Sequence, residues 1–274
     1  MNVGLLHPGA MGAVAGGACS SPVYWASQGR SAETADRASR YGLIDARDMG
    51  ALAAAVDVIV SVCPPHAALD VAGAVASTGF TGIYVDANAV SPSVAKAIGD
   101  RFERFVDGSI IGPPPHEAGT TRLYLSGDEA PSIAALWEGS ALEPRVLDGG
   151  AGAGSASVLK MAYAGWTKGS AALLLAMRAY AESTGVGEAL VAEWSESIPE
   201  LVDRVERTAR GVGPKAWRFA GEMEHIAVAL SDVELPSGFH EAAAAIYAAL
   251  ADLRSEEAPS LRDVMDRLGH EATS

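Results

Sequence analysis

The feature that most constrains the fold is a change of pattern at a glycine-rich run, residues 149–154. Before this run, short apolar segments alternate with alanine-rich helical patterns, which is typical of parallel strand–helix–strand units in a doubly wound sheet. After it, no strand pattern occurs. The sequence therefore predicts an α/β domain over residues 1–150 and an all-helical domain over residues 151–274.

The predicted strands are short and apolar, and helix-length segments separate them. They cover Val3–Leu6, Val23–Ala26, Val56–Val62, Ile83–Val85 and Phe105–Ile111, with Arg122–Leu125 and Arg145–Leu147 as added edge strands. A proline-free segment from Ser155 to about Ser183 is apolar around most of its circumference, which predicts a long helix buried between the domains or in a subunit interface. Further helices are predicted at about 187–210, 214–232, 237–254 and 260–269.

Charge and composition exclude several classes of function. The net charge of −14 would repel nucleic-acid phosphates, so no nucleic-acid partner is predicted. No stretch approaches the roughly 20 apolar residues of a membrane span, and Met1–Leu6 has no basic segment of the kind that opens a signal peptide. Cys19 and Cys63 form no CxxC pair, and the histidines show no metal-ligand spacing. We therefore expect a cytoplasmic protein with neither metal nor membrane partner.

The first predicted strand runs into a glycine turn, His7-Pro8-Gly9-Ala10-Met11-Gly12, and then into a small-residue helix. A dinucleotide-binding turn needs glycine where the backbone meets the pyrophosphate and where the helix packs on the sheet, and Gly9 and Gly12 occupy these two places. His7 replaces the glycine of the tight turn, so an ordinary strand–helix turn is the alternative. The context favours a Rossmann-like cofactor domain in which Gly9, Ala10 and Met11 bind the pyrophosphate at a helix N-terminus.

The end of the second predicted strand distinguishes NADP from NAD. A carboxylate at this place would bind a free ribose 2′-hydroxyl, but the segment Ala26-Ser27-Gln28-Gly29-Arg30-Ser31 contains none. Ser27, Arg30 and Ser31 can instead donate to a 2′-phosphate, so NADP is predicted. The alternative is that Arg30 is a solvated loop residue and that Ser31 only caps the next helix.

Two more loops follow predicted strands, at the sheet edge where ligands bind in open α/β folds. Cys63, Pro64 and Asn88 belong to these loops and are predicted to contact the cofactor. Ser91 is placed to cap a helix. Cys63 is interpreted as a packed small residue and not as a nucleophile, because no base is identifiable beside it.

Lys160 is the candidate catalytic residue. The chain has only four lysines against sixteen arginines, and this one lies inside the apolar helix just after the glycine run. Burial lowers the pKa of an amine, which suits general acid–base chemistry near neutrality. Tyr163 and Thr167 follow at i+3 and i+7 on the same helix face and could complete a proton relay. Snorkelling of Lys160 to solvent is the alternative.

These motifs together resemble the β-hydroxyacid dehydrogenase superfamily, which includes 6-phosphogluconate dehydrogenase-like proteins. The resemblance covers almost the whole chain and rests on HPGAMG, SVCPP, VDANAVSP and GAGSASVLKMAYAGWTKG. WRFAGEMEHIA and GFHEAA are similar to the bacterial branch that has a short helical C-terminal domain. The resemblance implies that Lys160 is the general acid–base, and it implies a homodimer with packed C-terminal helices.

The chain departs from that family at two places. Ala164 stands where an asparagine usually follows the catalytic lysine, and Ile111 replaces the serine of the substrate segment. The run DGSIIGPP is similar to a loop of NADPH-dependent imine reductases, but those enzymes usually place aspartate or tyrosine at the position of Lys160. A charged lysine would repel an iminium ion, so a carbonyl or hydroxyl substrate is favoured and imine reduction is the alternative.

The predicted function is hydride transfer between NADP(H) and a small carbonyl or hydroxy substrate. Lys160 would give or take the hydroxyl proton, Ser109 would help orient the substrate, and His240 would contact it from the helical half. A non-catalytic NADP-binding sensor or regulatory protein is the rival class. Such a protein would keep the glycine turn and Arg30 but would have no need of a buried lysine.

Overall fold

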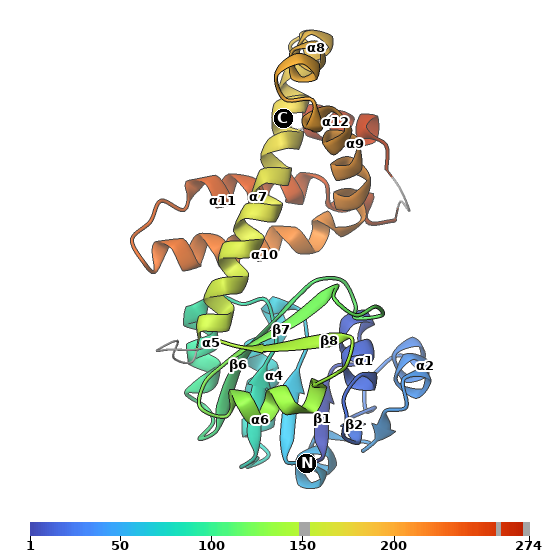
Figure 1. The fold of residues 1–274 in the computed structure, drawn as a ribbon, viewed down its shortest axis with the longest axis vertical. Helices are drawn as coiled ribbons and strands as arrows, with labels where there is room; N and C mark the ends of the chain where they lie inside the picture. Colours follow the sequence, from blue (N-terminus) through green and yellow to red (C-terminus); the bar gives the residue numbers. More distant parts are fainter. Residues whose placement is uncertain (148–153, 256–258, 271–274) are drawn as a thin grey trace. The chain divides into compact units, whose positions relative to one another are not determined.

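The computed structural model describes residues 1–147, 154–255 and 259–270. The chain divides into two compact units, Met1–Met161 and Ala162–Ser274, and the division falls within the long helix α7 (Ser155–Ser183) (Figure 1). The boundary predicted at residue 150 lies in the segment 148–153, outside the described residues.

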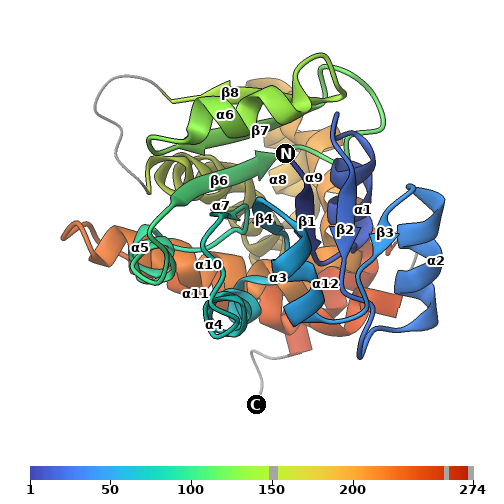
Figure 2. The ribbon, with the colours of Figure 1, turned by 90° about the horizontal axis from the view of Figure 1, so that it is seen from below.

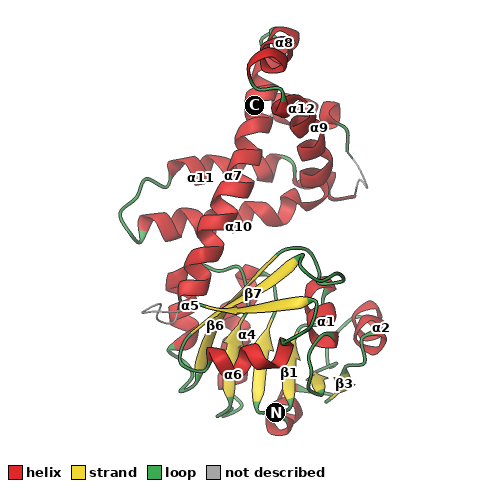
Figure 3. Ribbon diagram, in the orientation of Figure 1, coloured by secondary structure: helices red, strands yellow, loops and turns green. Residues whose placement is uncertain are grey.

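Unit 1 is built on one eight-stranded sheet (Figure 3). Its strands are β1 (Val3–Leu6), β2 (Val23–Trp25), β3 (Ile44–Asp45), β4 (Val58–Ser61), β5 (Ile83–Asp86), β6 (Phe105–Ile111), β7 (Thr121–Ser126) and β8 (Leu142–Val146). The order across the sheet is β3-β2-β1-β4-β5-β6-β7-β8, with parallel pairing from β3 to β6 and an antiparallel step at β7. This is the doubly wound order, which changes direction between β1 and β4.

Helices cover both faces of this sheet (Figure 2). They are α1 (Ala10–Gly17), α2 (Ala32–Arg40), α3 (Met49–Ala55), α4 (Ala68–Ala76), α5 (Pro92–Gly99) and α6 (Ala130–Ala134), with short 3₁₀ turns η1 (Pro65–Ala67) and η2 (Ala135–Trp137). Residues of α1, α2 and α6 share one apolar core with the sheet, and residues of α3, α4 and α5 share a second. Successive strand residues alternate between these cores, with Leu5 in the first and Leu6 in the second.

The sequence predicted most of these strands, and the structure confirms them. Phe105–Ile111 has the predicted bounds, although polar residues interrupt its apolar run. Of the two added strands, β8 forms an edge of the sheet as predicted, whereas β7 lies inside the sheet. β3 was not predicted, because it has only two residues and both are exposed, which leaves no apolar pattern to recognise.

Local capping fixes several helix starts in unit 1. The side chain of Ser31 accepts a hydrogen bond from the Thr34 amide at the start of α2, and Asp48 does the same for Ala51 at the start of α3. Ser91 caps α5, with Pro92 in its first turn. The capping role predicted for Ser91 is therefore confirmed, and Ser31 makes the capping contact that was its alternative role.

Unit 2 contains only helices among its described residues. After α7 come α8 (Gly187–Ser197), α9 (Glu200–Val212), α10 (Ala216–Ser231), α11 (Gly238–Ala249) and α12 (Leu261–His270), with 3₁₀ turns η3 (Gly213–Lys215) and η4 (Ala251–Ser255). This confirms the all-helical prediction, and α7 has the predicted bounds. The stretch predicted at 187–210 is two helices that separate at Pro199, which cannot continue the preceding hydrogen-bond pattern.

Lys168 ties three helices of unit 2 together. Its amine pairs with the Glu222 carboxylate of α10 and lies 4.5 Å from the centre of the Phe219 ring, and both charged side chains are mostly buried. The Lys168 carbonyl accepts a hydrogen bond of 2.6 Å from the Tyr247 hydroxyl of α11. Nearby on α7, a Cβ added to Gly165 would lie 3.2 Å from His240, so α7 and α11 are in close contact. Lys168 is thus a structural residue of unit 2.

Candidate cofactor and proton-transfer site

The glycine turn, residues 7–12, joins β1 to α1 at the carboxyl edge of the sheet, where the parallel strands end. A Cβ added to Gly12 would lie 2.4 Å from the His7 carbonyl oxygen, so only glycine fits there. A Cβ added to Gly9 would meet nothing within 4 Å, so the space above this residue is open. The amide groups in the first turn of α1 have no carbonyl within the helix to which they can donate a hydrogen bond. The turn therefore combines an open backbone surface with free donors, which suits a phosphate group.

The selection loop, residues 26–31, follows β2 beside this turn. Its Arg30 guanidinium makes a close hydrogen bond with Nε2 of His7. The Ser27 hydroxyl donates to the Asp45 carboxylate at 2.9 Å, and the Gln28 amide donates to the Arg47 carbonyl at 2.8 Å. Ser27 and Arg30 are therefore both held by neighbours, and the acid that the sequence segment lacked stands close by on β3.

Asn88 connects the two loops that follow β4 and β5. Its side-chain oxygen accepts a hydrogen bond of 2.6 Å from the Cys63 amide, and its Nδ2 donates to the Ser61 hydroxyl at 3.1 Å and to the Asp86 carboxylate. Asn88 is almost fully buried, so its polar groups brace the Cys63–Pro64 loop. Burial raises the pKa of the Cys63 thiol to about 11, which agrees with its interpretation as a packed residue.

A row of buried polar side chains crosses the sheet beside this loop. We call Ser61, Asp86, Asp107 and Ser126 the polar row; they are paired in register on β4, β5, β6 and β7, and all are fully buried. Burial raises the pKa of Asp86 to about 7, with a smaller contribution from the nearby Asp107 carboxylate, while the Asn88 hydrogen bond opposes the shift. Among the described residues, Oδ2 of Asp86 has no hydrogen-bond partner.

Asp107 holds the start of α7 on the sheet. Its carboxylate accepts hydrogen bonds from the Ser157 amide at 2.9 Å, the Ser157 hydroxyl at 2.6 Å and the Ser126 hydroxyl at 3.1 Å. The Ser126 hydroxyl in turn accepts from the Ala156 amide at 3.2 Å. Burial still raises the pKa of Asp107 above its usual value, and these hydrogen bonds oppose that shift. A carboxylate at a helix N-terminus also interacts favourably with the helix dipole.

This anchor places Lys160 one turn further along α7. The half-buried Lys160 donates a hydrogen bond of 2.7 Å from its amine to the Ile110 carbonyl, near the end of β6. β6 is parallel to β5, so its end belongs to the same carboxyl edge as the glycine turn. The amine therefore lies against the sheet.

The four predicted substrate residues have different surroundings. Ser109 is fully buried on β6, and within the described residues its hydroxyl has no hydrogen-bond partner. The side chain of Tyr163 is 49% exposed, and the Thr167 hydroxyl donates to the Tyr163 carbonyl at 3.0 Å within α7. His240 lies in unit 2, with Nε2 at 3.3 Å from the Gly165 carbonyl and a buried Nδ1 that has no partner among the described residues.

Sequence reasoning gave no role to the two buried acids or to the β3 end. Asp86 and Asp107 carry a signal that could have been used, since each is an acid at or inside an apolar strand. Asp45 and Arg47 carry no such sequence signal, because their contacts with the selection loop depend on the pairing of β3 with β2 in the sheet. Arg47 also has a left-handed backbone with φ of 74°, a conformation that non-glycine residues rarely adopt.

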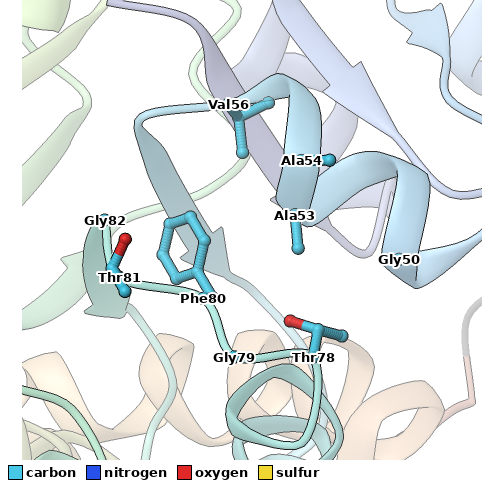
Figure 4. A pocket seen from close by; sticks show the side chains of 9 residues that line it. All are labelled: Gly50, Ala53, Ala54, Val56, Thr78, Gly79, Phe80, Thr81 and Gly82. Atoms are coloured by element: carbon cyan, nitrogen blue, oxygen red, sulfur yellow. The ribbon is translucent and has the colours of Figure 1, made fainter.

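A hollow of about 330 Å³ lies at the opposite edge of the sheet (Figure 4). Its lining includes Ala53, Val56 and Phe80, together with Thr78 and Thr81. The Thr78 hydroxyl donates to the Val75 carbonyl at 2.7 Å, so it is already used within the fold. The hollow has no charged lining residue and lies away from the glycine turn, so it adds nothing to the candidate site.

Within the described ranges, no group of three or more histidine, cysteine, aspartate or glutamate side chains could hold a metal ion. The helices among these residues include none that is long and apolar enough to cross a membrane.

The family model for the domain of unknown function DUF1932 matches residues 181–250, within unit 2. An uncharacterized 28.5 kDa protein of Methanothermus fervidus is 33% identical over 185 residues, and the alignment spans 66% of this chain and 66% of that protein. The chain thus matches slightly less than two thirds of the length of this relative.

Solved structures resemble nearly the whole chain. The conserved protein MTH1747, of unknown function and described as similar to 3-hydroxyacid dehydrogenases, is 24% identical with a TM-score of 0.70, covering 94% of this chain and all of that one. A 3-hydroxyisobutyrate dehydrogenase of Mycobacterium tuberculosis with L-serine is 15% identical with a TM-score of 0.71, covering 97% and 98%. Psf3, in complex with NADP+ and 2-OPP, is 18% identical with a TM-score of 0.61, covering 97% and 99%. The chain therefore has the fold of the 3-hydroxyacid dehydrogenases, and its helical unit carries the segment described as DUF1932.

Proposed function

We propose that the protein is an NADP-dependent oxidoreductase that transfers a hydride between the nicotinamide and a small carbonyl or hydroxy substrate, with Lys160 as the general acid–base. The observation that carries the proposal is the hydrogen bond from the Lys160 amine to the Ile110 carbonyl. It puts a proton-carrying group at the carboxyl edge of a doubly wound sheet, the edge at which such folds bind their ligands. Fold likeness to a dehydrogenase and to an NADP+ complex supports the reaction class.

The residues of unit 1 fit a dinucleotide. The open space above Gly9 and the free amides of Ala10 and Met11 would receive the pyrophosphate. Arg30 and Ser27 would bind the 2′-phosphate, for which a guanidinium offers two parallel donors. Cys63 and Pro64, braced by Asn88, would face the cofactor from the next loop. The bound cofactor would supply or accept the hydride.

Lys160 would handle the proton that accompanies the hydride. A protonated amine donates to a carbonyl oxygen as the carbon is reduced, and a neutral amine accepts the hydroxyl proton in the reverse direction. The Ile110 carbonyl accepts one of the three donors of an ammonium group, so it can orient the amine and leave other donors for substrate. Of the four predicted substrate residues, we assign none a step in this reaction.

The test compares NADPH turnover by the wild type and by Lys160→Ala against ketoacids, aldehydes and cyclic imines. We expect carbonyl turnover to fall by about 10²- to 10⁴-fold in the variant, the usual contribution of a general acid–base. Lys96→Ala is the matched control, because Lys96 is exposed and pairs only with Asp100 among the ion pairs of the described residues. Unchanged turnover in Lys160→Ala would refute its assigned role. Turnover of imines alone would favour an imine reductase, and tight NADPH binding without turnover would favour a sensor.

We also propose that unit 2 binds a second copy of the chain. Trp166, Leu173, Met177 and Tyr180 are exposed on α7 at spacings of seven, four and three residues, which place them on one helix face. About a two-fold axis this face would pack against the same face of the second copy. Light scattering on a sizing column should give a dimer for the wild type and a monomer for Met177→Lys. Glu188→Lys, at an exposed site elsewhere, should stay dimeric; a monomeric wild type would disprove the interface.

A further inference from the structure

His7 occupies the place in the glycine turn where a dinucleotide-binding turn has its first glycine. Nε2 of its side chain makes a close hydrogen bond with the Arg30 guanidinium of the selection loop. The residue that departs from the expected pattern thus contacts the residue proposed to select the cofactor. This contact joins segments that are 23 positions apart in the chain.

The backbone on both sides of this contact is fixed. The His7 amide donates to the Val62 carbonyl at 3.2 Å, and the Gly9 amide donates to the His7 carbonyl at 2.7 Å. On the other side, the Arg30 amide donates to the Ser27 carbonyl at 3.0 Å, and Gly29 has a φ of 74° that closes this turn. The imidazole is therefore presented to Arg30 by a rigid scaffold, whereas Arg30 itself is exposed and would otherwise sample many rotamers.

The chemistry of the pair requires a neutral imidazole. A guanidinium has only donors, so Nε2 of His7 must be the acceptor and the ring proton must be on Nδ1. Burial, with a smaller contribution from the nearby Arg30 charge, lowers the pKa of His7 to about 4. Arg37 of α2 also lies at this turn, and its guanidinium donates to the Pro8 carbonyl at 3.3 Å. The imidazole thus remains an acceptor at neutral pH.

We propose that His7 is a positioning residue that holds the Arg30 guanidinium in place for the 2′-phosphate of NADP. This inference rests on the proposed function for its ligand. A single preset rotamer reduces the conformational entropy that Arg30 loses when it binds a phosphate. His7 therefore increases the preference for NADP over NAD without contacting either cofactor at the distinguishing group.

The binding test uses His7→Leu and His7→Gln as a matched pair, with NADPH and NADH titrated by calorimetry. Leucine removes the acceptor, and we expect NADPH to bind about 5- to 30-fold more weakly with NADH changed less than twofold. Glutamine keeps a side-chain oxygen acceptor, and we expect it to restore NADPH affinity to within about threefold of the wild type. In an Arg30→Ala background, His7→Leu should have no further effect on NADPH, because the guanidinium that it positions is absent.

Equal weakening of NADPH and NADH by His7→Leu would overturn the inference, since it would mean that His7 acts on the shared part of the cofactor. An undiminished effect of His7→Leu in the Arg30→Ala background would also overturn it. A wild type that binds NADPH no better than NADH would instead refute the cofactor choice of the proposed function. A loss of selectivity in Arg30→Ala but not in His7→Leu would refute the inference alone.

A measurement on the protein without cofactor tests the contact itself. Nitrogen-15 NMR of the histidine rings should show His7 neutral at pH 6, with Nε2 unprotonated, and Arg30→Ala should raise the pKa of His7. That pKa should stay below the usual histidine value, because burial is the larger cause of the shift. A His7 ring protonated on Nε2 at pH 6 would rule out the acceptor role.

Discussion

Two regions along the sheet's carboxyl edge in unit 1, one at β1 and one at β5–β6, are built in opposite ways. At the β1 end, the glycine turn works through missing side chains, with open space above Gly9 and no room for a Cβ at Gly12. At the β5–β6 end, the structure depends on side chains that are present and buried, namely Asp86 and Asp107 with their serine and asparagine partners. The region at β1 exposes backbone donors to a ligand, and the region at β5–β6 encloses carboxyl groups between the sheet and α7.

The two regions also differ in how far apart in the sequence the residues that specify them lie. The glycine turn is specified by six consecutive residues, so a short motif identifies it. The contact between Asp107 and Ser157 joins positions 50 residues apart, and neither residue predicts the other. Substitutions in the two regions should accordingly have different effects. Those at the buried carboxyl groups of β5–β6 should lower the free energy of unfolding, and those in the glycine turn should lower cofactor affinity.

The largest expected effect is that of Asp107→Ala. Three buried donors lose their acceptor, and each unsatisfied group costs about 1–3 kcal/mol, so the free energy of unfolding should fall by about 3–9 kcal/mol. Urea unfolding followed by circular dichroism measures this loss. Asp128→Ala, at an exposed acid, should change stability by less than about 0.5 kcal/mol. A loss for Asp107→Ala as small as that of the control would show that this carboxylate does not anchor α7.

Asp86 should make stability depend on pH in the opposite sense to an ordinary surface acid. Its pKa is raised from 3.8 to about 7, so between these values the folded state keeps a proton that the unfolded state has lost. The stability that this proton contributes is present below about pH 4 and is lost as the pH rises through 7. At about 1.4 kcal/mol for each unit of pKa, the loss from pH 4 to pH 8 is about 4 kcal/mol.

Asp86→Asn tests this dependence, because it keeps an acceptor for Asn88 but cannot ionise. Unfolding free energies of the wild type and the variant should diverge steadily between pH 4 and pH 8, with the variant gaining relative to the wild type. The difference between the two curves removes the contribution of the other acids. Parallel curves would mean that Asp86 titrates normally and is not enclosed as described.

Along this edge, the sequence predicted the features that consecutive residues specify and not the contacts between residues far apart in the chain. The strand Phe105–Ile111 was predicted despite Asp107 and Ser109, because apolar residues still dominate it, and the glycine turn was predicted from its motif. Lys160 was selected as an isolated lysine in an apolar helix, but its contact with the Ile110 carbonyl required the folded sheet. The contact between His7 and Arg30 was not predicted either, since a histidine in place of glycine looks only like a defect in the motif.

Gly12→Ala should have an intermediate effect on both stability and binding. The added methyl would lie 2.4 Å from the backbone oxygen of His7, which cannot move freely because the turn is hydrogen-bonded on both sides. Overpacking of this kind costs about 1–3 kcal/mol. Thermal unfolding should show the loss, and NADPH and NADH affinities should fall together because the whole turn shifts. Full stability in this variant would contradict the tight approach of α1 to His7.

Gly9→Ala should give the smallest change in stability and is the sharpest contrast with Gly12→Ala. The backbone at Gly9, with φ of −70° and ψ of −171°, is accessible to alanine, and the methyl would meet nothing within 4 Å. Alanine is a poorer helix cap than glycine, but it also lowers the entropy of the unfolded chain, so the net change should stay within about 0.5 kcal/mol.

The methyl would nevertheless occupy the open space proposed for the pyrophosphate. NADPH and NADH should therefore both bind roughly tenfold more weakly, a change of about 1.4 kcal/mol in binding free energy measurable by calorimetry. Because the pyrophosphate is common to both cofactors, their affinity ratio should remain that of the wild type, unlike the ratio in His7→Leu. Unchanged affinity for both cofactors in a fully stable Gly9→Ala protein would mean that the open space above the turn is not where a dinucleotide binds.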